Sequence, residues 1–139
     1  MNHLDPSHIE YVEDPCPSYA DIRSVATHTG IGVALDEILC CEGQWDFFPQ
    51  LKGLILKPML IGSLEKCHDL VVKAKANGVK VVISSSHESQ LGNRLLALLA
   101  TEWSPEQAPG LDTLRYFNGS VLDDKQQVDV SKLQVVWQS

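Results

Sequence analysis

Residues 31–58 read IGVALDEILCCEGQWDFFPQLKGLILKP and contain two short apolar runs. The first run ends on Asp36 and the second on Lys57. Short runs of this composition are typical of buried parallel strands, and in a β/α barrel the carboxyl ends of such strands carry the functional side chains. Taken singly, Asp36 would as readily cap the following segment and Lys57 lie on the surface. The functional interpretation therefore requires the same pattern elsewhere in the chain.

Apolar runs of strand length do recur along the chain. They start near residues 9, 31, 53 and 79, and a fifth short strand is expected over 111–115. Strand–helix units of this length in strict alternation predict a parallel α/β fold with right-handed crossovers. All five expected strands finish on or near a polar residue. In a β/α barrel the carboxyl ends of the strands meet at one open end, here called the mouth. The residues that would meet there are Glu13, Asp36, Lys57, Ser84 and Asp112.

Helical patterns separate the expected strands. Ser18 and Ser63 are suited to cap the first two helices, which would end near Gly30 and at Asn77-Gly78. A third helix is expected over 89–101, with an apolar face made of Leu91, Leu95, Leu98 and Leu99. Residues 128–137 are expected to form either a further strand or a packing arm. We therefore divide the chain into a barrel portion, 1–117, and a polar tail of the same domain, 118–139.

Composition excludes several classes of protein. The net charge of −7 makes nucleic acid and anionic membrane surfaces poor partners. No apolar run approaches the roughly 20 residues that a membrane-spanning helix needs, and the first ten residues, MNHLDPSHIE, lack the pattern of a signal peptide. No C-x-x-C pair occurs among Cys16, Cys40, Cys41 and Cys67. We therefore expect reduced cysteines in a cytoplasmic protein.

The residues at the expected mouth suggest a particular chemistry. Carboxylates from separate strands, Glu13 and Asp36, suit a hard divalent cation such as Mg²⁺. Lys57 beside that cation could act as a base or acid, or stay charged and stabilise an anion. His87 and Glu88, after the serine run 84–86, either take part in catalysis or begin the next helix and line the rim. The chain has neither a G-x-S-x-G elbow nor a glycine-rich phosphate-binding motif.

Five stretches of the chain resemble the o-succinylbenzoate synthase family of the enolase superfamily. They are IEYVEDPC (9–16), TGIGVALDEIL (29–39), LILKPMLIGSLEKC (54–67), VVISSSHESQLG (81–92) and PGLDTL (109–114). They follow the family's order and lie close to its spacing. The family's E-E-P is E-D-P here and its D-E-S is D-E-I, but the first acid of each pair, Glu13 or Asp36, is retained.

The resemblance implies a fold, a reaction and a role for each matched residue. The fold would be the C-terminal half of a (β/α)₇β barrel. The reaction would be the Mg²⁺-dependent syn elimination of water from a small carboxylate substrate in menaquinone biosynthesis, through an enediolate. Glu13 and Asp36 would bind Mg²⁺, and Lys57 would stabilise the enediolate. The substrate carboxylate would be held by Ser84, Ser85, Ser86, Gly110, Asp112 and Thr113.

Parts of the family's pattern have no counterpart in these 139 residues. They are the K-x-K strand with the catalytic base, the strand with the first metal-binding Asp, and the capping domain. A full β/α barrel takes about 250 residues. Five strands would leave an unpaired edge and an apolar inner face exposed. We therefore expect little activity from the chain alone, and a complementing N-terminal half or a homo-oligomer as partner.

Three alternatives remain open at this point. The chain could be a non-catalytic remnant that binds a ligand or oligomerises. The same mouth would also suit a racemase of N-acylamino acids. An open, five-stranded receiver-like signalling domain also places acids, a hydroxyl residue and a Lys-Pro pair at strand ends. In this chain, however, Lys57-Pro58 follows the third strand, whereas a receiver has that pair after its fifth.

Overall fold

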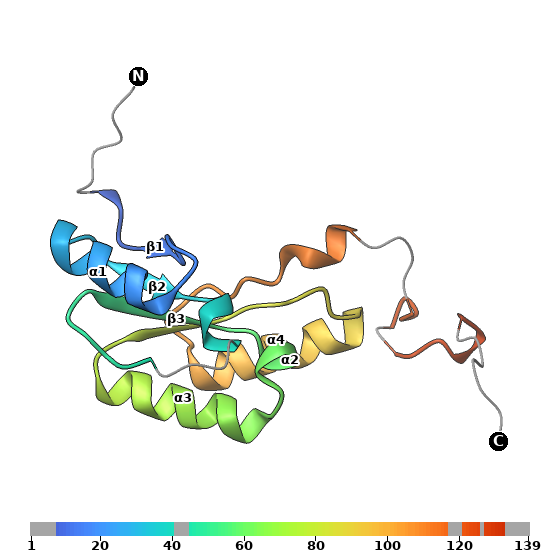
Figure 1. Ribbon diagram of the computed structural model, residues 1–139. Helices are drawn as coiled ribbons and strands as arrows, with labels where there is room; N and C mark the ends of the chain where they lie inside the picture. Colours follow the sequence, from blue (N-terminus) through green and yellow to red (C-terminus); the bar gives the residue numbers. More distant parts are fainter. Residues whose placement is uncertain (1–7, 41–44, 117–120, 126, 133–139) are drawn as a thin grey trace, which may run out of the picture.

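The computed structural model describes residues 8–40, 45–116, 121–125 and 127–132. Its sheet is parallel, with strand order β1-β2-β3-β4, and each strand pairs with the next one along the chain. The strands are β1 (Val12–Glu13), β2 (Val33–Leu35), β3 (Leu51–Leu56) and β4 (Lys80–Ile83). Longer helices connect or follow them, as Figure 1 shows: α1 (Tyr19–Thr29), α3 (Leu64–Ala76) and α4 (Gln90–Trp103). The predicted parallel α/β architecture is confirmed.

The sequential strand order separates this fold from the receiver-like alternative. A flavodoxin-like or receiver-like sheet has the order 2-1-3-4-5, in which the chain reverses direction across the sheet. Here the order runs 1-2-3-4 without reversal, as it does around a barrel.

One hydrophobic core lies between the sheet and the three long helices. Alternate residues of β2, of the second half of β3 and of β4 belong to it, including Leu35, Leu54 and Ile83, all of which are fully buried. Ile22 and Ala26 of α1 pack against the same cluster, as do residues of α3 and α4. Because the side chains of a strand alternate between its two faces, the residues between these core positions point to the other face of the sheet.

The helix ends agree with the sequence-based expectation. The Ser18 side chain accepts a hydrogen bond from the Asp21 N–H, and the Ser63 side chain accepts one from the Lys66 N–H. Each serine therefore satisfies an N–H that has no partner inside its helix. Gly30 ends α1 with φ of +77°, a left-handed conformation that glycine adopts without steric cost.

Of the expected apolar face of the third helix, Leu99 packs against the core, but the other three leucines are exposed. Leu91 and Leu98 are 54% and 69% exposed, and the buried residues of α4 are Asn93, Leu96 and Ala100. Leucine and alanine occur all round α4, so periodicity alone does not fix which side packs. Asn93 donates a hydrogen bond from its side chain to the Leu111 carbonyl over 2.9 Å. This bond turns the Asn93 face toward the sheet.

The expected fifth strand over 111–115 is also wrong. The sheet has four strands, and a single parallel bridge joins Gly110 to Ser84 beyond the end of β4. The chain then enters the short 3₁₀ helix η3 (Asp112–Tyr116). Asp112 and Arg115 form an ion pair across one turn of it, over 2.8 Å. Of residues 111–115 only Thr113 is β-branched, so strand propensity there is low.

The inner face of the sheet is covered, contrary to expectation. Ala34 and Ile55, which alternate with the core positions, are buried. A Cβ placed on Gly53 would lie 3.8 Å from the Tyr11 ring, which therefore covers this part of the face. Lys80 of β4 forms an ion pair with Glu10, which precedes β1, across two intervening strands. This pair shows that the sheet curls toward its inner side.

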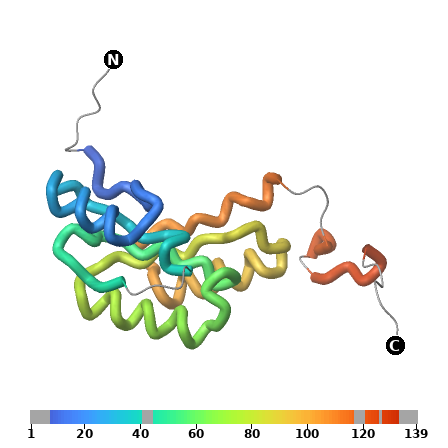
Figure 2. Tube along the Cα trace, in the orientation of Figure 1, coloured from blue at the N-terminus to red at the C-terminus, as the bar shows by residue number. Residues whose placement is uncertain are grey.

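The edge of the sheet agrees better with expectation. Both residues of β1 are exposed, and β1 pairs with β2 alone. Beyond η3, residues 121–125 and 127–132 lie apart from the sheet and the long helices, as Figure 2 shows. There Leu122 forms an antiparallel bridge with Val128, and η4 (Val130–Lys132) follows. Residues 133–137 of the expected strand or arm lie outside the described residues, and the proposed division at 117/118 stays a prediction.

The remaining expectations concern cysteines and membranes. Cys16 and Cys67 are free thiols, and Cys41 lies outside the described residues. Burial is the main cause that raises the pKa of the Cys67 thiol, which keeps it protonated and unreactive at neutral pH. In the part of the chain that the structure describes, no helix is long and apolar enough to cross a membrane.

Candidate active site at the strand ends

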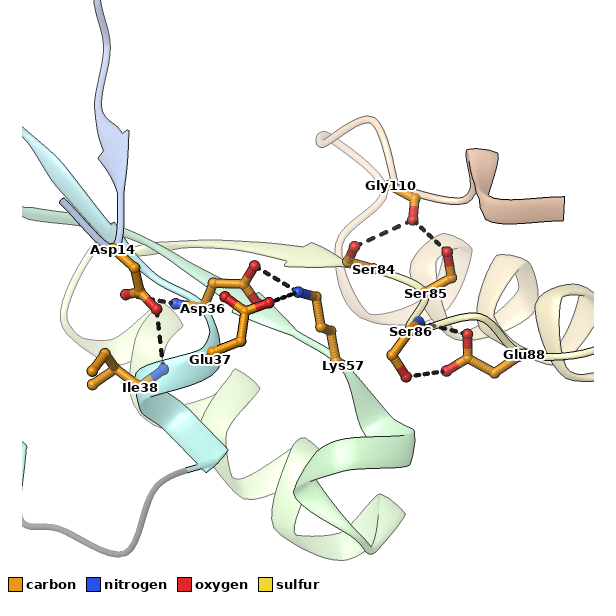
Figure 3. A network of polar contacts seen from close by, with 10 residues as sticks. All are labelled: Asp14, Asp36, Glu37, Ile38, Lys57, Ser84, Ser85, Ser86, Glu88 and Gly110. Atoms are coloured by element: carbon orange, nitrogen blue, oxygen red, sulfur yellow. Dashed lines mark hydrogen bonds and ion pairs between the residues drawn. The ribbon is translucent and has the colours of Figure 1, made fainter. Parts of the chain in front are cut away.

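Asp36 and Lys57 meet at the carboxyl ends of two neighbouring strands. Asp36 follows β2 and Lys57 follows β3, and the two strands pair with Leu35 opposite Leu54. The Lys57 Nζ lies 2.7 Å from the Asp36 Oδ2 (Figure 3). The two side chains are only 14% and 11% exposed. The stretch 31–58 thus folds so that its two charged strand ends form one partly buried ion pair.

Glu37 adds a second carboxylate to the same lysine. Its Oε1 lies 2.5 Å from the Lys57 Nζ, while its side chain is 65% exposed. Figure 3 shows both acids on the same side of the Lys57 ammonium, which contacts each of them. Sequence analysis did not assign Glu37 a role, although it quoted the D-E pair. In an extended chain adjacent side chains point to opposite faces; here Glu37 opens the 3₁₀ helix η2 (Glu37–Cys40), which turns it back toward Lys57.

Lys57 lowers the pKa of both acids, but burial makes the net shifts of the two pKa values opposite. Burial raises the pKa of Asp36, and the hydrogen bond from Lys57 offsets this only in part. The hydrogen bond from Lys57 lowers the pKa of the more exposed Glu37. Burial alone would lower the pKa of Lys57, but the hydrogen bonds to the two carboxylates outweigh it and raise that pKa. Lys57 is therefore a cation at neutral pH, suited to stabilise an anion rather than to remove a proton.

Asp36 also has an unsatisfied oxygen. Its Oδ1 is buried and has no hydrogen-bond partner among the described residues, which is costly for a carboxylate unless a cation or water meets it. Glu13 ends β1, the next strand, and is exposed. Its charge is one of the influences that raise the pKa of Asp36, so the two acids lie within electrostatic reach of each other. Oxygen donors of this kind fit Mg²⁺.

Two acids would supply only part of a Mg²⁺ coordination sphere. Among the described residues, no three His, Cys, Asp or Glu side chains gather as a set that could hold a metal ion. Mg²⁺ commonly keeps several waters and takes one or two carboxylates from the protein. A cation at Asp36 would therefore take its remaining ligands from water, from substrate or from residues beyond those described.

Asp14 is a second residue that sequence analysis did not single out. Its carboxylate accepts hydrogen bonds from two backbone N–H groups, that of Asp36 at 3.2 Å and that of Ile38 at 3.1 Å. Figure 3 shows Asp14 on the far side of Asp36 from Lys57. The signal in the sequence was the family's E-E-P motif, in which this chain has Asp as the second acid.

The hydroxyl side of the mouth is built around one carbonyl group. The Oγ atoms of Ser84 and Ser85 lie 3.2 and 3.0 Å from the Gly110 carbonyl oxygen, which also accepts the Ser85 N–H. The Ser85 Oγ lies 2.8 Å from the Thr113 Oγ1. The structure thus brings together four of the residues that were predicted to hold the substrate carboxylate.

Ser86 forms a separate contact with Glu88. The Glu88 carboxylate accepts the Ser86 N–H at 2.6 Å and the Ser86 hydroxyl at 2.9 Å (Figure 3). Glu88 is buried, and Ser89, next to it, caps α4. His87 has φ of +71°, and its ring lies 6.2 Å from that of Tyr116. Of the two alternatives for Glu88, the geometry favours a residue that shapes the entry to the helix.

Asp112 does not join the serines. It is exposed on η3, where its partner is Arg115. The predicted role of Asp112 in holding a substrate carboxylate would also place two negative charges together, which is unfavourable.

Comparison with proteins of known identity bears directly on this arrangement. The chain is 40% identical over 128 residues to an o-succinylbenzoate synthase of Pasteurella multocida, covering 86% of this chain and 38% of that protein. It is 40% identical over 119 residues to the enzyme of Haemophilus influenzae and 37% identical over 139 residues to that of Yersinia enterocolitica. This chain is homologous to part of o-succinylbenzoate synthase. The resemblance inferred from the five motifs is confirmed.

The relation is partial in length. The chain spans 35–43% of the length of these three o-succinylbenzoate synthases. The crystal structure of MenC from Desulfotalea psychrophila matches 84% of this chain with a TM-score of 0.70 and 23% identity, over 35% of that protein. This likeness supports the fold, an open part of an enolase-type barrel. No protein-family model matches the chain.

Proposed function

We propose that this chain forms the part of an o-succinylbenzoate synthase barrel that carries the anion-stabilising lysine and two metal-binding acids. The observation that carries the proposal is the partly buried Lys57–Asp36 pair at adjacent strand ends, 2.7 Å apart, in a chain about 40% identical to such enzymes. The substrate would be a small carboxylate that loses water by syn elimination.

Lys57 would act by charge. Removal of the α-proton from a carboxylate substrate builds negative charge on the carboxylate oxygens, and a fixed cation in a partly dry site stabilises that charge. The raised pKa of Lys57 keeps it in the ammonium form for this task. Mg²⁺, held by Glu13 and Asp36, would supply further positive charge to the same carboxylate when bound.

The serines and the 110–113 loop would form the opposite wall. Each serine hydroxyl already has an acceptor within the chain, either the Gly110 carbonyl or Glu88. A substrate carboxylate would have to draw the hydroxyl of Ser84 or Ser85 away from Gly110. Ser84 is the better donor for this, because its bond to Gly110 is the longer at 3.2 Å.

The remaining parts of the reaction would come from elsewhere. The stretches that match the family contain no K-x-K strand, so the lysine that removes the proton would lie outside these 139 residues. We propose that the chain is active only in combination with the rest of the barrel, as a complementing half or through a larger assembly. The free thiols fit a cytoplasmic setting.

Complementation tests this proposal. The chain is purified and assayed for dehydration with Mg²⁺, alone and together with the remaining portion of the Pasteurella multocida enzyme. We expect activity only in the mixture, and its loss by at least about a hundredfold on Lys57→Met, since one oriented charge contributes that much. Lys73→Met, on the exposed side of α3, serves as the control.

Four outcomes would count against the proposal. Turnover by the chain alone at an ordinary enzymatic rate would show that the base lies within it. Activity of the mixture that is indifferent to Lys57→Met would remove the lysine from the mechanism. A mixture that binds but does not turn over any carboxylate substrate would favour the non-catalytic alternative. Racemisation of an N-acylamino acid by the mixture would replace the reaction while keeping the site.

A further inference from the structure

We propose that Asp14 is a positioning residue that holds Asp36 and Glu37 against Lys57. The effect that this positioning would have on catalysis rests on the proposed function. The effect of Asp14 on where Asp36 and Glu37 contact Lys57 does not. Asp14 touches neither Lys57 nor the expected substrate position. It acts on the backbone from which both acids project.

The first element is a hydrogen-bonded connection between the ends of β1 and β2. The Asp14 N–H donates to the Ala34 carbonyl at 3.0 Å. The Asp14 carboxylate in turn accepts the N–H groups of Asp36 and Ile38. Three hydrogen bonds therefore join this single residue to the exit of β2. Two of them involve a charged acceptor, which makes them stronger than neutral ones.

The second element is the position of those two N–H groups. They belong to the residues on either side of Glu37, so the backbone is held just before Asp36 and just after Glu37. Asp36 and Glu37 are the two partners of Lys57. By fixing this backbone, Asp14 sets the positions from which both carboxylates reach Lys57, and it leaves the buried Asp36 Oδ1 without a partner.

The third element is the backbone of Asp14 itself. Its φ is +32°, in a region that asparagine, aspartate and glycine tolerate better than other residues. Pro15 follows it and restricts its conformation further. The short aspartate side chain reaches N–H groups close to its own backbone. This gives a physical reason for Asp in place of the family's second Glu at this position.

The test uses variants that keep this backbone conformation. Asp14→Gly tolerates the positive φ but removes the carboxylate, and Asp14→Asn keeps one oxygen acceptor. Asp123→Asn is the matched control, because the Asp123 carboxylate also accepts two backbone N–H groups, those of Lys125 and Gln127. Unlike Asp14, it lies beyond η3 and away from the strand ends.

The first readout does not depend on metal or activity. Hydrogen exchange of the Asp36 and Ile38 amides should accelerate about tenfold in Asp14→Gly, the factor that corresponds to about 1.4 kcal/mol for a lost charge-assisted hydrogen bond. The ¹⁵Nζ resonance of the Lys57 ammonium should shift or broaden in Asp14→Gly and change less in Asp14→Asn. Asp123→Asn should leave it unchanged. An unchanged Lys57 resonance in Asp14→Gly would overturn the proposal.

The second readout concerns the proposed function. Binding of Mn²⁺, as a paramagnetic probe for Mg²⁺, should weaken several-fold in Asp14→Gly, and kcat of the complemented enzyme should fall more than KM rises. Unchanged binding and kcat in a variant with a shifted Lys57 resonance would overturn the positioning role in catalysis. If the parent chain neither binds Mn²⁺ nor complements, the proposed function fails, and the Lys57 resonance still decides the placement of the ion pair.

Discussion

The polar residues at the strand ends form two groups that differ in how their polar atoms are paired. We call Asp36, Glu37 and Lys57 the acid–lysine half, and the serines 84–86 with Gly110 and Glu88 the hydroxyl half. In the acid–lysine half, Lys57 has two carboxylate partners, Asp36 retains an unpartnered buried oxygen, and the pKa values of all three groups are shifted. In the hydroxyl half, serine hydroxyls and amides are paired with the Gly110 carbonyl and with Glu88. The acid–lysine half therefore still has an oxygen that could accept a cation or a hydrogen bond. In the hydroxyl half these groups are already hydrogen-bonded within the chain.

This difference follows from burial and charge. A buried ion pair is costly to form, because both ions lose hydration, and it stays in place only where the backbone holds it. Neutral hydroxyls lose less hydration and are satisfied by one carbonyl oxygen. We therefore expect substitutions in the acid–lysine half to alter both stability and chemistry, and those in the hydroxyl half to alter mainly the shape of the wall.

The largest expected effect is that of Lys57→Met. The substitution keeps the side chain's length but leaves Asp36 buried without its cation, so we expect the free energy of unfolding to fall by about 3 kcal/mol at pH 7. Denaturant unfolding of the chain measures this. Lys57→Met combined with Asp36→Asn should recover most of the loss. A single variant as stable as the parent would show that the pair is screened by water.

Glu88→Gln is expected to have the next largest effect. The amide side chain cannot accept both Ser86 donors, so a charge-assisted bond is lost and stability should fall by about 2 kcal/mol. Glu102→Gln, at an exposed position on α4, provides the control and should change stability by less than about 0.5 kcal/mol. Equal effects of the two substitutions would mean that the hydroxyl half is not held by Glu88.

Ser85→Ala should have a smaller effect, of about 1 kcal/mol, because one neutral side-chain bond to Gly110 is lost and Thr113 loses its neighbour. Ser84→Ala should cost less still, since its bond to the same carbonyl is longer. Thermal or denaturant unfolding of the two variants compares them. A reversed order would show that Ser84 is the main contact between β4 and the 110–113 loop.

The smallest expected effect is a change in acid stability on Glu37→Gln. The pKa of Glu37 is lowered in the folded chain by Lys57, so its contribution is present above the ordinary glutamate pKa of about 4.3 and is lost as pH falls through the lower folded value. Asp36 also faces Lys57, but its raised pKa has the opposite sign and adds stability at acid pH.

The expected measurement follows from these signs. Glu37→Gln should lower stability slightly at pH 7, by less than about 1 kcal/mol because the Glu37 side chain is largely exposed, and the difference from the parent should shrink below about pH 4. Unfolding curves at pH 7 and pH 3.5 measure it. A difference that grows on acidification would contradict the assigned direction of the Glu37 shift.

Much of the fold could be predicted from the sequence. The strand–helix alternation, the serine caps and the glycine at the end of α1 depend on local physical chemistry, namely propensity, capping and backbone freedom. The errors lie where local signals were weak. Apolar residues all round α4 left its orientation open, and a short run with one β-branched residue was taken for a strand.

The candidate site was predictable in part for a similar reason. Asp36 and Lys57 stand at the ends of apolar runs, a signal that needs only the order of residues and the geometry of parallel strands. Glu37 reaches Lys57 because the chain turns after β2. Asp14 acts by accepting two backbone N–H groups, and Glu88 is placed by its burial in the folded chain. None of these leaves a periodic signal in the sequence.

The sequence by itself determined a parallel α/β chain related to part of a known enzyme, with charged residues at its strand ends. The tertiary structure decided which of those charges meet. Curling of the sheet covered the inner face, the turn after β2 brought a second acid to Lys57, and Asp14 fixed the backbone of that turn. Such contacts depend on distances between strands and on solvent exclusion, and both arise only when the chain is packed.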